Sequence, residues 1–184
     1  MKGFSEYLAD IARINRLGAY QPVEWLFHTG MLFSTLDKWW GDFKSRATAH
    51  EGIDITYFRT RPGEIHRFDD TILIPAMEDG PLLNICDDFL GRTLVVEQEN
   101  NTTSEVRVIF AYAHIRPEKR LIKGYRIRKN EIIARICDTQ KNPQLPPHLH
   151  FSCFEVEKAV LPEDLNWNLF SNSTAVNPVH PVFL

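Results

Sequence analysis

The N-terminal part of the chain carries a helical pattern followed by an aromatic one. Over residues 4–16 apolar residues recur near helical spacing with polar residues between them, which predicts a short amphipathic helix. Residues 22–43 are rich in aromatic side chains and are interrupted by Gly30 and by Gly41-Asp42. We therefore expect an extended or mixed segment here, packed on the main body of the protein.

From about residue 46 the pattern changes to that of short β-strands. Residues 106–113 form an almost unbroken run of β-branched and aromatic residues, as expected of a strand that is buried on both faces. Turn signals such as Pro62-Gly63 and Lys123-Gly124 separate this run from other apolar runs. Further strands are predicted at residues 53–58, 71–75, 91–97, 121–123, 131–137 and 148–156. Many short strands with regular turns favour a mainly β fold with an antiparallel sheet as its core.

After residue 156 the chain becomes polar and rich in residues that favour turns, which predicts a loop-rich C-terminal extension wrapped over the core. We expect a single globular unit with three parts. These are an N-terminal segment of residues 1–45, a β domain of residues 46–156 and an extension of residues 157–184. A chain of 184 residues buries roughly 70% of the surface of its unfolded form, so this unit can have a hydrophobic core of its own.

Composition and charge exclude several classes of protein. The net charge of −3 gives no electrostatic reason to expect nucleic acid or an anionic membrane as the main partner. No run of about 18 apolar residues occurs, so no membrane span is expected, and the first ten residues do not have the pattern of a secretory signal. The three cysteines, Cys86, Cys137 and Cys153, contain no C-x-x-C pair, which argues against a cysteine zinc ribbon and favours structural thiols.

Two histidines close together near the C-terminal end of the β region carry candidate chemistry. In a strand, residues two apart project from the same face, so His148 and His150 would point to one side, while Leu149 and Phe151 point to the core. Two imidazoles held side by side suit a metal or catalytic site. A surface H-x-H that arose by chance is a comparable interpretation of these residues alone.

A second cluster joins His50 and Asp54, separated by three residues. Catalytic zinc sites usually have three protein ligands from His, Asp or Glu and leave a fourth position for water. His50, Asp54 and one imidazole of the later pair could form such a site, in which the pKa of bound water falls from ~15.7 to ~7. A solvated loop pair is the alternative. Gly52, followed by the apolar Ile53 and Ile55, instead favours a tight turn that runs into a buried strand.

Taken together, these segments resemble the lysostaphin-type, LytM-like zinc endopeptidases, which have a β fold with an active-site groove. Residues 50–54, His-Glu-Gly-Ile-Asp, are similar to the H-x-G-x-D segment of that family. Residues 148–151, His-Leu-His-Phe, are similar to its H-L-H-F signature, and residues 112–115, Tyr-Ala-His-Ile, to its Y-x-H-L segment. The connecting strands agree in order, so the resemblance covers about residues 46–156.

The resemblance implies one zinc ion per chain, held by His50, Asp54 and His150. It implies that His114 and His148 are a non-ligand pair that activates water and stabilises the developing oxyanion, without showing which histidine has which role. It also implies peptidoglycan peptides as the substrate, peptide-bond hydrolysis as the reaction, and a location in the periplasm or at the cell wall. The oligomeric state stays open.

Some segments depart from the family or match none of its elements. The loop at residues 137–147 has no glycine where relatives have a Gly-rich loop, which leaves substrate preference open. Residues 57–71 resemble an insertion that either forms one wall of the groove or is a solvated charged hairpin. The Trp39-Trp40 pair either lines a substrate-binding surface or packs in the core. His28, His66 and His180 match no element and are expected to be surface or capping residues.

Tyr112 lies two residues before His114, so it could face the same groove and contact substrate. A tyrosine packed in the core is at least as well supported by the sequence, because apolar residues surround Tyr112 on both sides.

Two alternatives to an active enzyme fit the sequence less well. A non-catalytic LytM-like binding module that regulates another cell-wall hydrolase would characteristically lack ligands or catalytic histidines, whereas all five positions are filled here. A structural zinc site is normally closed by four protein ligands and favours cysteine. Both are therefore less favoured than a zinc endopeptidase.

Overall fold

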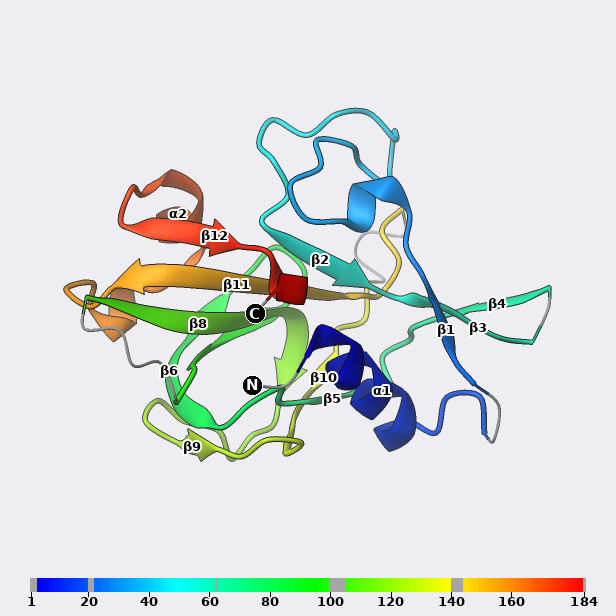
Figure 1. Cartoon of the computed structure of the whole chain (residues 1–184), viewed down its shortest axis with the longest axis horizontal. Helices are drawn as coiled ribbons and strands as arrows, with labels where there is room; N and C mark the ends of the chain where they lie inside the picture. Colours follow the sequence, from blue (N-terminus) through cyan, green and yellow to red (C-terminus); the bar gives the residue numbers. More distant parts are fainter. Residues whose placement is uncertain (1–2, 20–21, 62, 100–104, 140–143, 184) are drawn as a thin grey trace.

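The protein has a mainly β fold with antiparallel sheets, as predicted (Figure 1). The computed structural model describes residues 3–19, 22–61, 63–99, 105–139 and 144–183. The strands are β1 (Glu24–Leu26), β2 (Gly52–Ile55), β3 (Tyr57–Arg61), β4 (Glu64–Arg67), β5 (Leu73–Pro75), β6 (Gly80–Asp87), β7 (Arg92–Glu97), β8 (Val106–Pro117), β9 (Arg126–Ile127), β10 (Ile132–Ile136), β11 (Leu149–Glu157) and β12 (Val176–Val179). The helices are α1 (Phe4–Ile14), η1 (Thr29–Met31), η2 (Pro162–Asp164), α2 (Trp167–Asn172) and η3 (Pro181–Phe183).

The larger sheet is built around β8 and β11. Its strand order is β12-β11-β8-β7-β6-β9; in addition, β2 pairs with β11, and β10 pairs with both β5 and β8. The long apolar run predicted as a buried strand is β8. Phe110 and Tyr112 of β8 project into the main core, and Ile109 and Ala111 project into a second core on the opposite face. Burial on both faces explains why this strand has an unbroken apolar sequence rather than an alternating one.

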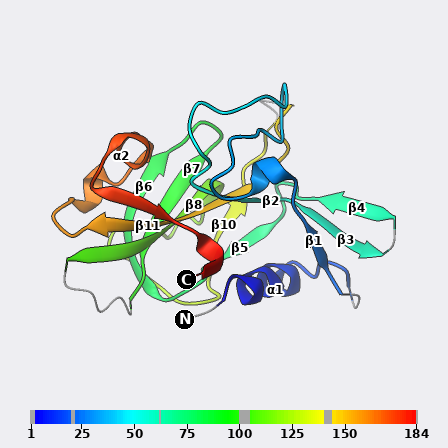
Figure 2. The same cartoon turned by 45° about the horizontal axis from the view of Figure 1, so that its top comes forward.

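Helix α1 covers the main core, as the helical pattern of residues 4–16 predicted (Figure 2). Phe4, Tyr7, Leu8 and Ile11 recur at intervals of three and four and are all buried. The Tyr7 hydroxyl donates a hydrogen bond to the carbonyl of Pro75, 3.1 Å away, which ties the helix to β5.

Two predicted strands differ from the structure. Residues 121–123 form a turn instead of a strand, because the Leu121 and Tyr125 amides bond to carbonyls three residues back and Gly124 has a φ of 84°. The predicted strand at residues 53–58 is divided into β2 and β3 at Thr56. The Thr56 hydroxyl donates to the carbonyl of Pro147, so the chain leaves the large sheet at this point and enters a smaller one.

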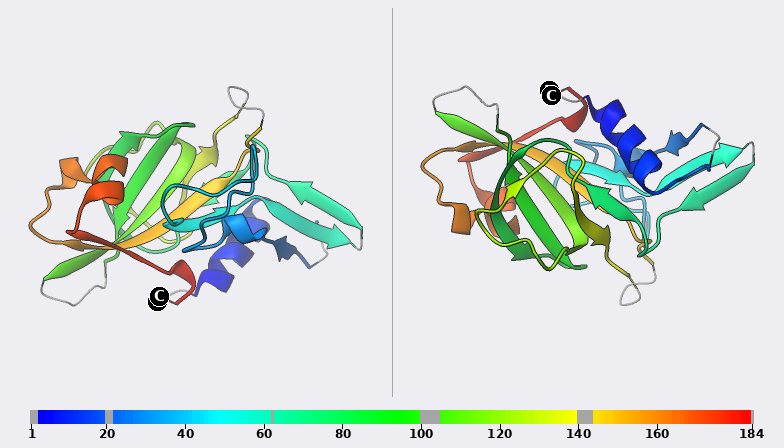
Figure 3. Two further views of the ribbon diagram at one scale, coloured as in Figure 1. Left: turned by 90° about the horizontal axis from the view of Figure 1, so that it is seen from above. Right: turned by 90° about the horizontal axis from the view of Figure 1, so that it is seen from below.

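Strands β1, β3 and β4 form this smaller sheet, and the β3–β4 hairpin extends away from the main sheet to one end of the molecule (Figures 1 and 3). All four residues of β4 are exposed. Residues 57–71 therefore contain the charged, solvated hairpin that was one of the two expectations for them.

The C-terminal extension is more regular than the predicted loops. It contains α2, which packs on the second core through Phe170, and β12, which pairs with β11 as an added strand. In Figure 3, α2 lies at the end of the molecule opposite the β3–β4 hairpin. None of the helices in the described ranges is both long and apolar enough to cross a membrane.

Candidate metal centre

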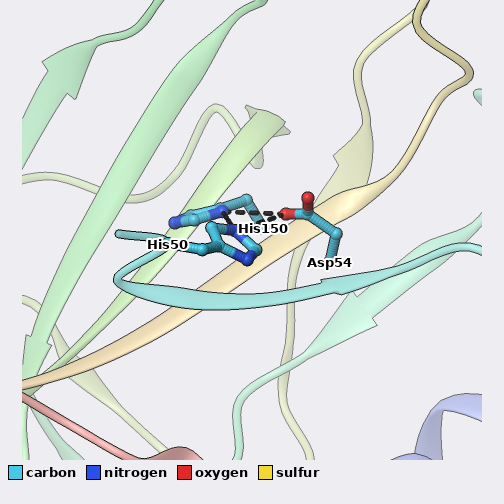
Figure 4. A group of neighbouring side chains, drawn as sticks. All are labelled: His50, Asp54 and His150. Atoms are coloured by element: carbon cyan, nitrogen blue, oxygen red, sulfur yellow. Dashed lines mark hydrogen bonds and ion pairs between the residues drawn. The ribbon is translucent and has the colours of Figure 1, made fainter. Parts of the chain in front are cut away.

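His50, Asp54 and His150 come together where β2 pairs with β11 (Figure 4). Asp54 and His150 are direct cross-strand partners in this antiparallel pair, and His50 lies just before β2. His150 Nδ1 lies 2.8 Å from Asp54 Oδ1 and 3.1 Å from His50 Nε2, and His50 Nε2 lies 3.3 Å from Asp54 Oδ1. The three side chains are buried. These distances show that His150, one of the two histidines of the His148/His150 pair, lies in the same cluster as His50 and Asp54.

Hydrogen bonds on the outer side of each imidazole fix the ring orientation. His50 Nδ1 lies 3.0 Å from the carbonyl of Leu32. Because a carbonyl can only accept, His50 carries its proton on Nδ1 and directs the Nε2 lone pair to the cluster. His150 Nε2 lies 2.7 Å from Ser152 Oγ, so Nδ1 is the nitrogen that His150 offers to the cluster. Outer contacts of this kind set the tautomer and orientation of metal-binding histidines.

Gly52 allows the two strands to approach closely at this point. A Cβ placed on Gly52 would lie 2.4 Å from Ser152 Oγ, 2.7 Å from the Phe151 carbonyl oxygen and 3.0 Å from His150 Cε1. A larger residue would therefore displace both His150 and the hydroxyl that orients it. The close approach of β2 and β11 thus requires a glycine at position 52. This requirement is independent of the tight turn that the sequence predicted.

Asp54 is ionised and carries two further contacts that the sequence did not indicate. Burial works to raise the pKa of Asp54, but its electrostatic interactions with His50 and His148 and its hydrogen bonds with His150 and His50 outweigh burial and hold that pKa well below its usual range. Trp39 Nε1 donates to Asp54 Oδ2 at 2.6 Å, and Arg46 Nη2 lies 3.6 Å from the same oxygen.

His114 reaches the same region through a β-bulge in β8. His114 has a φ of 62°. Tyr112 pairs with Leu94 of β7 and Ile115 pairs with Arg92, so β8 has one more residue than β7 between these two pairs. The extra residue reverses the alternation of side chains along the strand. Consequently His114 faces the cluster of His50, Asp54 and His150, and its ring centroid lies 4.8 Å from that of His148.

Of the two interpretations of Tyr112, the structure supports a packed core residue and not one that faces the groove. Tyr112 is fully buried in the main core, and its hydroxyl accepts a hydrogen bond from the amide of Met77 at 2.9 Å. Its ring packs against Tyr7 and Phe151. In a regular strand, Tyr112 and His114 would lie on the same face because they are two residues apart. The left-handed backbone of His114 turns its side chain to the opposite face.

Asp88 holds His114 in place and was not identified from the sequence. Its Oδ1 lies 3.0 Å from His114 Nδ1, and its Oδ2 accepts from the backbone amide of His114 at 2.9 Å. Burial works to raise the pKa of Asp88, but the bonds and charge of His114 outweigh it and leave the carboxyl strongly acidic. Asp88 lies 26 residues before His114, in the turn between β6 and β7, so no local pattern links the two.

His148 lies beside the three-residue cluster without joining it as closely. Its Nδ1 donates to the carbonyl of Pro146 at 2.9 Å, and its Nε2 lies 3.8 Å from Asp54 Oδ1. Burial lowers the pKa of His148 to about 3, although the Asp54 carboxylate opposes this shift. Its ring packs at 90° against Trp39, with centroids 5.2 Å apart. His148 is thus a neutral imidazole with its basic nitrogen facing the cluster.

A cavity of about 440 Å³ opens over these histidines. Its aromatic walls come from three separate parts of the chain, with Trp40 from the N-terminal segment, Phe89 from the β6–β7 turn and Trp167 from α2. Its other lining residues are Arg46, Glu51, Asp54, Asp87, Asp88, His114, His148 and His150. A concave site with aromatic walls and a few convergent polar groups is typical of ligand-binding sites.

The described parts of the insertion and of the glycine-free loop lie outside the lining of this cavity. Of the described residues in 57–71 and 137–147, none lines it, so the hypothesis that the insertion forms a groove wall is wrong for this cavity. Residues 140–143 of the glycine-free loop lie outside the described residues. His28, His66 and His180 also lie away from the cavity; the His28 ring accepts from the amide of Gly30 as a cap of η1.

The donor set fits a zinc ion. Zinc bonds of about 2.0–2.1 Å at tetrahedral angles place neighbouring ligand atoms about 3.3 Å apart, close to the 2.8–3.3 Å found among the three donors here. Two imidazoles and one carboxylate are also a common ligand set of catalytic zinc. Within the part of the chain that the structure describes, these three residues form a group able to hold a metal ion.

Comparison with protein-family models and with curated proteins finds no match. Solved structures of similar fold include LytU, with 19% identity and a TM-score of 0.44 over 76% of this chain and 81% of that one. Another is a zinc-containing peptidase from Vibrio cholerae, with 20% identity and a TM-score of 0.45 over 78% of this chain and 38% of that one. A point mutant of the catalytic domain of the prophage-encoded M23 protein EnpA from Enterococcus faecalis has 16% identity and a TM-score of 0.40 over 78% and 95%.

Of these three proteins, EnpA is described as an M23 protein and the Vibrio cholerae protein as a zinc-containing peptidase. At identities of 16–20% and TM-scores of 0.40–0.45, they assign no activity to this chain. The functional case therefore depends on the residues of the site.

Proposed function

We propose that this protein is a zinc-dependent endopeptidase that hydrolyses peptide bonds in the cross-links of bacterial peptidoglycan. The observation that carries the proposal is the combination of three buried donors with two further histidines on the open side of the cluster. His50, Asp54 and His150 would hold one zinc ion per chain. His148 and His114 remain available for the substrate, as in a catalytic site and unlike a closed structural one.

Zinc, when bound, polarises the scissile carbonyl and lowers the pKa of water from ~15.7 to ~7. The protein's own residues provide the proton transfers and the orientation of the substrate.

His148 has the properties of the proton acceptor. Its Nδ1–H is held by the Pro146 carbonyl, so Nε2 carries the lone pair and faces Asp54. Burial keeps the ring neutral at neutral pH, because the pKa is lowered to about 3. A neutral imidazole within reach of the reacting atoms can take a proton from the attacking water and later deliver it to the leaving amine.

His114 has the properties of the donor that stabilises the oxyanion. Its Nδ1 is held by the Asp88 carboxylate, 3.0 Å away, which leaves Nε2 for the substrate. A preoriented donor aimed at developing negative charge is worth roughly 10²–10³ in turnover number. We therefore assign the two roles that the sequence left open from the second contact of each ring, a backbone carbonyl for His148 and a carboxylate for His114.

Peptidoglycan as substrate, and the periplasm or cell wall as location, are proposed from the resemblance of the sequence motifs. The cavity supports a peptide substrate, since its aromatic walls can contact an extended peptide on either side of the catalytic histidines. We also propose that the three parts of the chain meet at residues 45/46 and 156/157. Both outer segments contribute a tryptophan to the cavity, so the site uses all three parts.

Incubation of the zinc-loaded protein with defined muropeptides, followed by separation and mass analysis of the products, tests this function. The wild-type protein is expected to convert cross-linked muropeptides into smaller, uncross-linked products. His150→Ala is expected to lose both zinc and cleavage. A zinc-loaded wild-type protein that cleaves no cross-linked muropeptide would contradict the proposal and favour a non-catalytic module that regulates another hydrolase.

A further inference from the structure

The two oxygens of the Asp54 carboxylate face different sets of partners. Oδ1 faces the other proposed ligands, 2.8 Å from His150 Nδ1 and 3.3 Å from His50 Nε2. Oδ2 faces the loop of residues 30–46, 2.6 Å from Trp39 Nε1 and 3.6 Å from Arg46 Nη2. Trp39 is buried, so water does not compete for this contact.

The loop of residues 30–46, which supplies both partners of Oδ2, is itself fixed in place. Arg46 donates to the carbonyl of Gly30 at 2.7 Å and to that of Asp37 at 3.0 Å, so its guanidinium closes the loop between them. A Cβ on Gly30 would lie 2.6 Å from the backbone nitrogen of Trp39, which shows how closely the two ends of this loop approach. Trp39 therefore reaches Asp54 from a defined position.

We propose that Trp39 and Arg46 are positioning residues that restrict Asp54 to a single metal-binding oxygen. The inference rests on the proposed zinc site. A carboxylate can bind a divalent cation through one oxygen or two. A second oxygen would occupy space that catalytic zinc leaves for water and substrate. Hydrogen bonds to an ionised carboxylate are about twice as strong as neutral ones, so Oδ2 stays with its indole donor.

The consequence is that Trp39, which lies outside the span of the sequence resemblance, contributes to the coordination of the metal. Trp39 belongs to residues 1–45, whereas the resemblance begins at about residue 46. The Leu32 carbonyl, which fixes the tautomer of His50, comes from the same segment. This segment thus contacts two of the three proposed ligands directly.

Cobalt(II) in place of zinc provides a test that needs no substrate, because four-coordinate cobalt absorbs visible light more strongly than five- or six-coordinate cobalt. Trp39→Phe removes the indole N–H and keeps an aromatic ring. Trp40→Phe is the matched control, since Trp40 is the neighbouring residue and lines the cavity. The readouts are the visible spectrum of the cobalt protein and the zinc dissociation constant from competition with a chelator.

We expect Trp40→Phe to keep the wild-type spectrum and zinc affinity. Trp39→Phe is expected to lower the visible absorption and to weaken zinc binding about tenfold or more. Because Trp39 is buried, Arg46→Met provides a second variant at a more accessible position, expected to change the spectrum in the same direction by a smaller amount.

A wild-type cobalt spectrum in both Trp39→Phe and Arg46→Met would overturn the inference, even if zinc binds more weakly. A wild-type protein that binds neither cobalt nor zinc is a different result, because it would overturn the proposed zinc site itself.

Discussion

Asp54 and His150 lie directly opposite each other on the antiparallel strands β2 and β11, with 2.8 Å between Oδ1 and Nδ1. Strand pairing thus joins two residues that are 96 positions apart in sequence. A shift of one residue in this pairing would turn His150 into the core and Leu149 toward Asp54. The register of a single strand pair is therefore a condition for the proposed zinc site.

Replacement of His148 should separate metal binding from catalysis. His148→Gln is expected to retain about one zinc per chain and to lower the turnover number by roughly 10²–10⁴, because the proton acceptor is removed while the three ligands remain. Metal analysis and muropeptide cleavage on the same sample measure both quantities. His66→Gln, on the exposed β4 strand, is the control and should match wild type. Loss of zinc from His148→Gln would assign His148 to the ligand set instead.

Asp88 should act through His114. Asp88→Asn is expected to lower the turnover number by about 10–100-fold with zinc content unchanged, because His114 loses the carboxylate that orients its ring. Asp87→Asn is a matched control: Asp87 is the adjacent residue, has a largely exposed side chain and pairs with Arg92. Turnover of Asp88→Asn equal to that of wild type would show that Asp88 has no part in the reaction.

Phe89 should contribute to substrate binding. It is 67% exposed, lines the cavity and packs its ring 4.7 Å from that of His114. Phe89→Ala is expected to raise KM about 3–10-fold, as for the loss of one aromatic contact of ~1 kcal/mol, with little change in thermal stability. Ile122→Ala, equally exposed but remote from the cavity, should leave KM unchanged. A large fall in turnover with an unchanged KM would contradict this role.

The metal-free protein should lose stability as the pH falls below about 6.5 because His148 is buried as a neutral ring. Its pKa is lowered to about 3 in the folded state, whereas an unfolded histidine titrates near ~6.5. The unfolded chain therefore binds the proton first, and this contribution is complete above pH ~6.5 and lost progressively toward pH 3. Between pH 8 and pH 5 the loss is about 2 kcal/mol.

Urea unfolding at these two pH values measures that effect. Wild type is expected to lose about 2 kcal/mol more than His148→Gln between pH 8 and pH 5. His150, whose pKa burial also lowers, contributes to both proteins alike and cancels in the comparison. An equal loss in both proteins would show that His148 is not held neutral.

Much of the site could be predicted from short-range patterns. Alternation along a strand placed His148 and His150 on one side with Leu149 and Phe151 in the core, as the structure shows. The same alternation also places Ser152, two residues beyond His150, on the side of the histidines, a signal that the sequence prediction missed. The mainly β fold could be predicted because short apolar runs separated by turn residues are typical of strands.

The remaining features depend on contacts between distant segments. No pattern around Trp39 or Asp88 indicates that these residues contact Asp54 and His114, because the contacts form only when loops from other parts of the chain fold over the sheet. The interpretation that Tyr112 shares a face with His114 is wrong for a different reason. A bulge reverses the side-chain alternation at His114, and a bulge is not visible in a run of uniformly apolar residues.

The most direct test of a zinc-dependent peptidase is the titration of metal-free protein with zinc while peptidoglycan hydrolysis is followed. Hydrolysis is expected to be absent without metal, to rise in proportion to added zinc and to level off at about one equivalent per chain. Asp54→Ala should remain inactive throughout the titration. Hydrolysis by the metal-free protein, or its absence at one equivalent of bound zinc, would contradict the proposed function.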